Sequence, residues 1–411
     1  MKPPDTAGQR APLWLLVLIT ISGTLAMHMF VPALPTVAHD FGASIAAMQM
    51  TISVYILGLA GGQLVYGPLS DSFGRRPLLI VGLALYVVAG LAAALATGVH
   101  TLVAARLFQA LGGCAGLVLG RAIVRDTAAA GEAVRDLALL NLVMMIGPGL
   151  APLLGSALAV SFGWRSIFVV LALLGAVTFV FTWRLLPETG RPTGSVGAAS
   201  LLRDYRLLLR SPSFAGFAMG GGCSTTSIFA FITAAPFIVA SELHRPLHEV
   251  GFYLALLMLG MALGNAITRF LVRRVALERL LIGANAVSVL SAVSLLMVVL
   301  LGGLTVVSAM GLMFLFAVGA GATSPAALTK ALSVDARLVG SAAGLYGFTQ
   351  MAVGALCTSL VGIGHSAALA SSVVLSVAAA LGQAGFWVGL RWERAVAGSL
   401  GHGGVIPDEI S

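Results

Sequence analysis

The sequence predicts an all-α membrane protein in which twelve transmembrane helices form two six-helix bundles. First, 59% of the 411 residues are hydrophobic and only 9% are charged, whereas soluble domains carry about 25% charged residues. Second, apolar runs of roughly 20 residues, the length that crosses a bilayer, recur along the whole chain. Third, one long polar interval divides these runs into six and six. Since lipid does not require a polar exterior, this composition favours a protein that crosses the membrane many times.

Short polar patches separate the expected spans. The first apolar run follows MKPPDTAGQR and continues to about Pro35, which is too long for the core of a signal peptide, and no small-residue cleavage site is evident. We therefore interpret it as an uncleaved transmembrane helix. The twelve expected spans cover residues 13–36, 46–69, 77–97, 101–123, 137–160, 165–186, 214–240, 249–270, 279–301, 304–328, 339–362 and 367–390.

The widest gap between spans reads PETGRPTGSVGAASLLRDYRLLLRSPS and is polar and basic. We interpret this interval, residues 187–213, as a cytoplasmic linker between two bundles. The N-terminal bundle then covers residues 1–186 and the C-terminal bundle covers residues 214–392, followed by a cytoplasmic tail at 393–411.

Lysine and arginine predict the orientation, because short loops rich in them stay on the cytoplasmic side. With both termini inside, almost all of these residues fall in cytoplasmic loops and tails, and only Arg165 and Arg245 lie outside. The net charge of +8 therefore reflects membrane topology and predicts no nucleic-acid partner. We expect a multi-pass protein of the cell inner (plasma) membrane, with the lipid bilayer as its surroundings.

The loop after the second span carries the motif GPLSDSFGRRP. Its spacing, G-x-L-x-D-x-x-G-R-R, resembles the signature loop of the major facilitator superfamily. Ser72 departs from the family, which often has a basic residue at this position. The structural alternative to a functional motif is a charged loop whose composition reflects membrane topology only. The motif positions are occupied by Gly67, Asp71, Gly74, Arg75 and Arg76.

The resemblance implies gating contacts for this loop. We expect the Asp71 carboxylate to face the N-terminus of a helix in the other half, whose dipole would stabilise it by roughly 0.3–1 kcal/mol. Arg75 is expected to pair with Asp126, which ends span 4. In the family, such contacts hold the cytoplasmic side closed in the outward-open state.

Spans 4 and 5 carry two further motifs. LVAARLFQALGG in span 4 is similar to the family pattern L-x-x-x-R-x-x-Q-G, with Ala110 where glycine is usual. GPGLAPLLG in span 5 resembles the proline–glycine motif of the exporters and contains Gly147, Pro148, Pro152 and Gly155. Each proline removes a backbone donor and bends the helix, while the glycines allow close approach. The bend either seals or flexes the interface between the halves, or it is purely structural.

Together with FVPALP in span 1 and GSAAGLYGFTQMAVGAL in span 11, these motifs resemble the bicyclomycin-resistance and chloramphenicol-exporter (Bcr/CflA) branch of the drug:proton antiporters. The resemblance covers nearly the whole chain. It implies a major facilitator fold with a central cavity worked by alternating access. It also implies proton-driven export of a small amphipathic drug or toxic metabolite. We expect the protein to be a monomer.

Two ionisable residues at membrane depth are candidate proton-coupling groups. Arg106 lies within span 4, where a charge costs at least ~2.5 kcal/mol and usually faces a cavity or a partner; snorkelling to the outer interface is the alternative. His28 stands where many relatives keep an aspartate, in a pattern like T-D-M-Y-L-P-A-L-P, and histidine titrates near physiological pH. From their depths we expect both to share one layer of the N-terminal bundle. A structural, hydrogen-bonded His28 is the alternative.

The fifteen Asp and Glu residues all fall in loops, tails or span ends, so no carboxylate is expected at mid-membrane. We expect no cofactor and no metal site. The candidates for a substrate cavity are polar or aromatic residues within spans, each of which could instead belong to the packed core. They are Tyr55, Gln63, Gln109, Asn141, Phe229, Asn265, Tyr346 and Gln350.

Two other functions remain open at the sequence level. One is the specific export or import of a single metabolite. The other is a polytopic membrane enzyme, such as a lipid-modifying transferase. An enzyme of that kind would need a carboxylate cluster, a nucleophile with a base or a metal-ligand set near the interface, and the sequence contains none. A transporter, and not an enzyme, is therefore the favoured interpretation.

Overall fold

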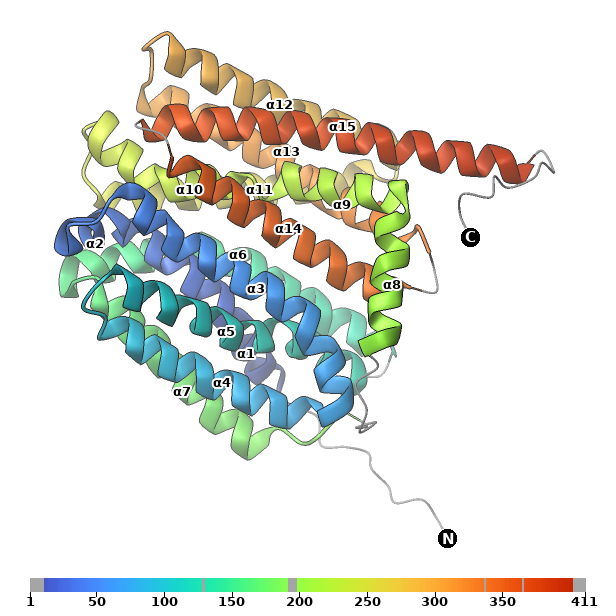
Figure 1. Ribbon diagram of the computed structural model, residues 1–411, viewed down its shortest axis with the longest axis horizontal. Helices are drawn as coiled ribbons and strands as arrows, with labels where there is room; N and C mark the ends of the chain where they lie inside the picture. Colours follow the sequence, from blue (N-terminus) through green and yellow to red (C-terminus); the bar gives the residue numbers. More distant parts are fainter. Residues whose placement is uncertain (1–10, 128–129, 191–197, 336–337, 364–365, 402–411) are drawn as a thin grey trace.

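The computed structural model describes residues 11–127, 130–190, 198–335, 338–363 and 366–401. Nearly all of these residues are helical, and no strand occurs among them. Long helices run side by side along one direction, whereas the short helix α8 (Ala198–Arg210) crosses their ends (Figure 1). The all-α class predicted from the sequence is confirmed.

The N-terminal half begins with an interrupted helix. Pro32 and Pro35 are the second residues of two successive helical segments, in the first turn, where a backbone N–H has no partner within the helix. The first expected span therefore becomes two helices joined by a 3-10 turn. The elements are α1 (Leu13–Phe30), η1 (Val31–Ala33), α2 (Leu34–Phe41), α3 (Ile45–Phe73), α4 (Arg75–Ala94), α5 (Val99–Thr127), α6 (Ala130–Phe162) and α7 (Arg165–Leu185).

The C-terminal half also begins with an interrupted span, since three consecutive segments replace the seventh expected helix. Pro212 starts the first of them, and the last is a π-helical turn. The elements are α9 (Pro212–Thr225), α10 (Ile228–Phe237), η2 (Ile238–Glu242), α11 (His248–Leu271), α12 (Leu277–Leu300), α13 (Val306–Leu332), α14 (Val339–Val361) and α15 (Ala367–Gly401).

Eleven helical segments in the described ranges are long and apolar enough to cross a membrane. The remaining expected span corresponds to α6, whose apolar described part runs over Gly147–Phe162. Some helices extend beyond the expected span ends. For example, α2 continues to Phe41 and α15 continues to Gly401. The interval interpreted as a linker contains a helix of its own, α8, which the sequence analysis did not anticipate.

Small residues bring the N-terminal helices into backbone contact around α5. Gly23 of α1 packs directly on Gly113, and the carbonyl of Ile19 leaves no room for a side chain on Gly116. Gly112 likewise faces the backbone of α4. Membrane helices associate through such close packing, because lipid removes the hydrophobic driving force between them. The abundant glycines therefore position α5, which carries Arg106, against its neighbours.

The two halves meet along α3 with α14 and along α6 with α11. Gly362, just beyond α14, packs on Ala46 and Gln49 at the start of α3. Gly251 near the start of α11 packs on the backbone of Pro152 in α6. These contacts bring one set of helix ends together across the interface between the halves.

Candidate functional site

Arg106 on α5 is fully buried in the N-terminal half. Its guanidinium carbon lies 3.9 Å from the ring centroid of Tyr55, 5.4 Å from that of Phe30 and 5.7 Å from that of Phe168. The rings come from α3, α1 and α7, so this aromatic cage forms only where four helices pack together. Complete burial contradicts the alternative in which Arg106 snorkels to the outer interface.

The Arg106 guanidinium has no carboxylate partner among the described side chains. Its Nη1 donates to Gln109 Oε1 at 2.7 Å, whereas Nε and Nη2 have no hydrogen-bond partner there. Cation–π contacts of a desolvated guanidinium are worth about 2 kcal/mol, so the rings replace part of the lost hydration. Tyr55 is held in place by a bond from its hydroxyl to the Gly23 carbonyl at 2.6 Å. Tyr55 and Gln109, expected in the cavity, therefore surround Arg106 instead.

His28 on α1 faces the other half of the molecule. Its Nδ1 lies 2.9 Å from the Thr24 carbonyl oxygen, and because a carbonyl only accepts, Nδ1 carries the proton of this bond. Nε2 is then the nitrogen left to exchange a proton. The imidazole lies edge-on to Phe229 of α10, with 6.2 Å between the ring centroids. His28 and Phe229 thus contact each other across the interface between the two halves.

The expected common layer does not bring His28 and Arg106 together. Phe30 belongs to the aromatic cage, and two residues along an α-helix turn through about 200°. His28 and Phe30 therefore point to opposite sides of α1. Arg106 lies on the inner side of this helix, within the bundle, whereas His28 lies on the side that faces the C-terminal half.

Two of the expected cavity residues in the C-terminal half connect α14 to α9 and its end. Gln350 Nε2 donates to Thr225 Oγ1 at 2.9 Å, and the Gln350 carbonyl accepts from Thr226 Oγ1 at 2.7 Å. Tyr346 is buried and lies against Gly221 of α9. Both side chains therefore have partners within their own half.

The remaining cavity candidates separate into different environments. Gln63 of α3 lies against Gly347 of α14, between the two halves. The Asn265 amide donates back to the Met261 carbonyl of its own helix at 3.0 Å. The Asn141 side chain lies outside the described residues. Gln63 is thus the member of this group that the structure places at the interface.

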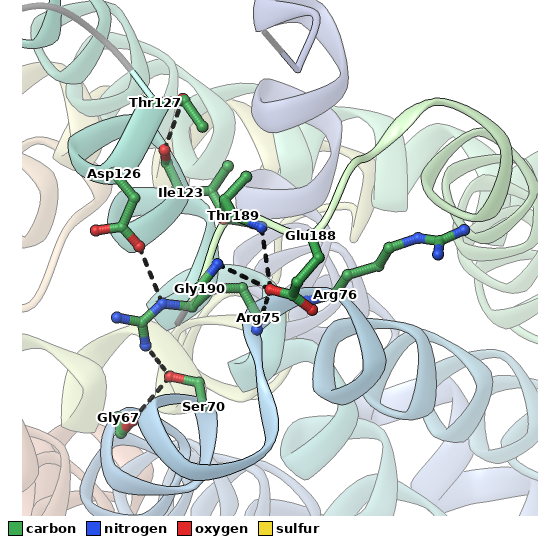
Figure 2. Close-up of polar contacts among 10 residues, drawn as sticks. All are labelled: Gly67, Ser70, Arg75, Arg76, Ile123, Asp126, Thr127, Glu188, Thr189 and Gly190. Atoms are coloured by element: carbon green, nitrogen blue, oxygen red, sulfur yellow. Dashed lines mark hydrogen bonds and ion pairs between the residues drawn. The ribbon is translucent and has the colours of Figure 1, made fainter. Parts of the chain in front are cut away.

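The signature loop forms a polar corner where α3 ends and α4 begins, next to the end of α5 (Figure 2). Arg75 Nε contacts Asp126 Oδ2 at 3.1 Å, so the expected ion pair is present. Arg75 Nη1 also donates to Ser70 Oγ, which in turn donates to the Gly67 carbonyl. The Asp71 side chain lies outside the described residues, so its expected contact with the other half stays a prediction.

Glu188, which the sequence analysis missed as a site residue, completes this corner (Figure 2). Its carboxylate accepts from the backbone N–H groups of Arg75 at 2.9 Å and Arg76 at 3.2 Å, the first residues of α4. Gly74, with φ of 95°, makes the turn in a conformation that glycine adopts readily, and a side chain there would collide with Glu188. The signal in the sequence was an acidic residue two positions after span 6.

Helix α6 carries the proline–glycine motif and continues through Pro148 and Pro152. Gly155 lies against the carbonyl of Met29, and Gly147 faces another residue of α1. Near Pro152, the same helix packs on α11 of the other half. The glycines thus provide the close approach that the motif predicts, while flexing at the prolines stays a prediction.

Known proteins resemble this chain over most of its length. Residues 16–358 match the family described as Major Facilitator Superfamily. An uncharacterized MFS-type transporter, YdgK of Bacillus subtilis (strain 168), is 29% identical over 95% of this chain and 98% of its own. A bicyclomycin resistance protein homolog of Haemophilus influenzae is 28% identical over 82% and 84%. A chloramphenicol resistance protein of Pseudomonas aeruginosa is 32% identical over 59% and 57%.

Solved structures share the architecture. A peptide transporter, POT, solved in complex with alafosfalin, superposes with a TM-score of 0.75 over 95% of this chain and 94% of its own, at 16% identity. A D-xylose-proton symporter superposes with a TM-score of 0.71 over 91% and 96%, also at 16% identity. At such low identity the likeness shows the fold alone.

Proposed function

The chain belongs to the major facilitator superfamily, and on that premise we propose that it exports small amphipathic drugs or toxic metabolites across the inner membrane by alternating access, driven by proton influx. The fold and the family make it a multi-pass membrane transporter. Relatives named for resistance to bicyclomycin and chloramphenicol support efflux of drugs. Both termini are cytoplasmic in this proposal, and the monomer is the working unit.

The observation that carries the proposal is the position of His28 between the halves. Alternating access moves one bundle against the other, so a group at their interface changes its surroundings in each cycle. The Nδ1 bond to Thr24 holds the ring in one orientation, and Nε2 remains available for a proton. Histidine titrates near physiological pH, so His28 is the proton-responsive group in place of the aspartate of many relatives.

Arg106 has a supporting role in this proposal. Its guanidinium is buried, and within the described residues it has no carboxylate partner and keeps two donor nitrogens without a hydrogen-bond acceptor. A fixed positive charge next to α1 attracts anionic groups and repels cations. The cavity therefore accepts neutral, zwitterionic or anionic compounds, and Gln63 and Phe229 line it at the interface.

The corner around Arg75 and Asp126 acts as part of the gate on the cytoplasmic side. Its ion pair connects the start of α4 to the end of α5, and its hydrogen bonds connect the start of α4 to Glu188 just after α7. In this proposal the three helix ends therefore move together. Asp71, which follows Ser70 at the same corner, supplies the contact with the other half in the closed state. The family motif and the contacts of Arg75 in the structure support this assignment.

Transport into inverted membrane vesicles tests the proposal, with a panel of uncharged and anionic antibiotics assayed with and without a proton gradient. In wild type, the gradient drives uptake. His28→Gln should abolish the gradient-driven part while retaining substrate binding, and His28→Asp should retain some coupling with a shifted pH profile. The matched control is His39→Gln, because the His39 side chain is 93% exposed.

Each outcome separates the parts of the proposal. Unchanged gradient-driven uptake in His28→Gln would show that the histidine is structural. Uptake of one compound alone from a broad panel would favour a specific metabolite transporter. No uptake of any compound by a stable wild-type protein, together with no change in drug susceptibility of an efflux-deficient host, would contradict drug export.

A further inference from the structure

The end of α11 forms a basic concavity that the transport site does not use. It has a volume of about 540 Å³ and is lined by Arg269, Phe270, Leu271, Arg273 and Arg274. The helix ends at Leu271, and the two arginines after it lie in the turn that follows. The concavity is therefore built from the last turn of a membrane-spanning helix and the first residues outside it.

The position of this end follows from the packing of α11. Gly251, near the other end of the helix, packs on Pro152 in the later part of α6, so α6 and α11 run antiparallel. The end at Leu271 thus lies at the same end of the bundle as the start of α6 and the end of α5. The proposed orientation makes this end cytoplasmic.

The positive charge of this concavity is not balanced within the described part of the chain. Arg269, Arg273 and Arg274 make no ion pair and no side-chain hydrogen bond with any described residue. Two acidic residues that come later in the chain, Glu278 and Glu393, already pair with other basic residues. Lys330 Nζ lies 2.8 Å from a carboxylate oxygen of Glu393. The Glu278 carboxylate forms ion pairs with Lys330 Nζ at 3.4 Å and with Arg394 Nη2 at 2.6 Å.

At the corresponding corner of the N-terminal half, the arginines have partners within the protein. There Arg75 pairs with Asp126, and Arg76 Nη2 donates to the Trp183 carbonyl at 2.7 Å. Arginine at a cytoplasmic helix end therefore finds protein partners in one half, whereas three arginines at the equivalent end of α11 find none in the described ranges. This contrast indicates a ligand from outside the chain.

Apolar side chains alternate with these arginines. Phe270 is 74% exposed, and Leu271 and Val272 are 40% and 47% exposed. Guanidinium groups bind phosphate oxygens in a bidentate manner, and exposed apolar groups at a helix end suit the upper acyl region of a bilayer. We propose that the end of α11 binds the phosphate headgroup of an anionic phospholipid, with Phe270 and Leu271 against its acyl chains.

The phosphate group is also found in small soluble anions, but the exposed Phe270 favours the lipid. A soluble phosphate ester would gain nothing from an apolar neighbour that faces outward. The headgroup of phosphatidylglycerol, by contrast, enters the arginine cluster while its chains follow the helix surface. The proposal thus commits to a lipid and leaves the soluble anion as an outcome of the test.

The experiment measures lipid binding to the full-length protein, purified in a neutral detergent, by native mass spectrometry. The probes are phosphatidylglycerol, phosphatidylcholine and glycerol 3-phosphate. The test variant combines Arg269→Gln, Arg273→Gln and Arg274→Gln. The matched control removes the same charge from the exposed face of α8, with Arg203→Gln, Arg206→Gln and Arg210→Gln.

Wild type should bind phosphatidylglycerol more tightly than phosphatidylcholine. The test variant should lose roughly 100-fold in affinity for phosphatidylglycerol, since each arginine near a membrane surface contributes about fivefold, and the α8 control should lose less than about threefold. Arg273→Gln alone should lose about fivefold, which gives a readout if the triple variant does not fold. Phe270→Ser should weaken the binding of phosphatidylglycerol more than it weakens the binding of glycerol 3-phosphate.

Three results would overturn the proposal. Equal losses in the test and α8 variants would show attraction to a basic surface without a local site. Glycerol 3-phosphate binding as tightly as phosphatidylglycerol, unaffected by Phe270→Ser, would make the site one for a soluble phosphate. Equal affinity of wild type for phosphatidylglycerol and phosphatidylcholine would exclude recognition of an anionic headgroup.

Discussion

Replacing Glu188 by alanine should destabilise the corner that connects α7 to α4. The Glu188 carboxylate accepts from four backbone N–H groups, those of Arg75, Arg76, Thr189 and Gly190, at 2.8–3.2 Å. Two of these donors are at the N-terminus of α4, where no earlier carbonyl of the helix can accept them. In Glu188→Ala, these N–H groups would donate to water or have no acceptor.

The magnitude follows from these bonds. Loss of a side-chain cap costs about 0.5–2 kcal/mol, and a hydrogen bond to a charged group contributes about 1.5–3 kcal/mol. Because Glu188 is exposed, water replaces part of the loss, and we expect the free energy of unfolding to fall by about 1–2 kcal/mol. Glu188→Gln retains one carbonyl oxygen without the charge, so it should lose about half as much.

The assay is the free energy of unfolding of the purified protein in mixed micelles, from an SDS titration followed by circular dichroism. Thr189→Ala is the matched control, because the neighbouring Thr189 hydroxyl has no hydrogen-bond partner in the described part of the chain. If Glu188→Ala and Thr189→Ala unfold with the same free energy, the carboxylate does not stabilise the start of α4, and the reasoning fails.

Three further predictions concern the gate, the cavity and the helix packing. Asp71→Asn should abolish export with normal membrane insertion; full export by a normally expressed variant would contradict a gating role. The protein should not export permanent cations, because a cation in a low-dielectric cavity needs a counter-charge; robust ethidium efflux in a fluorescence assay would refute this. Gly116→Ala should lower the free energy of unfolding by about 1–3 kcal/mol, since the added Cβ collides with the Ile19 carbonyl. Gly61→Ala is the control, because Gly61 has open space around it; it should not lower the free energy of unfolding, since alanine favours a helix more than glycine does.

The elements that depend on local composition were predictable. The spans follow from runs of apolar residues, because a helix needs about 20 of them to cross the bilayer. The pairing of Arg75 with Asp126 was also predicted, since both residues lie at helix ends on one membrane face and the motif spacing brings them together. The predicted helix ends were less accurate, because a helix can continue through polar residues beyond its apolar part, as α15 does.

The sequence by itself thus determined the number of spans and the residue types that require explanation, His28 and Arg106 among them. Only the tertiary structure decided what surrounds these two residues. The cage of Arg106 takes rings from three other helices, and their approach depends on glycines whose contacts lie far apart in the chain. The face on which His28 lies follows from the rotation of α1 against α5, since Phe30 turns toward Arg106. Sequence patterns record the period of a helix but not its rotation against its neighbours, because in lipid that rotation is decided by close packing between helices.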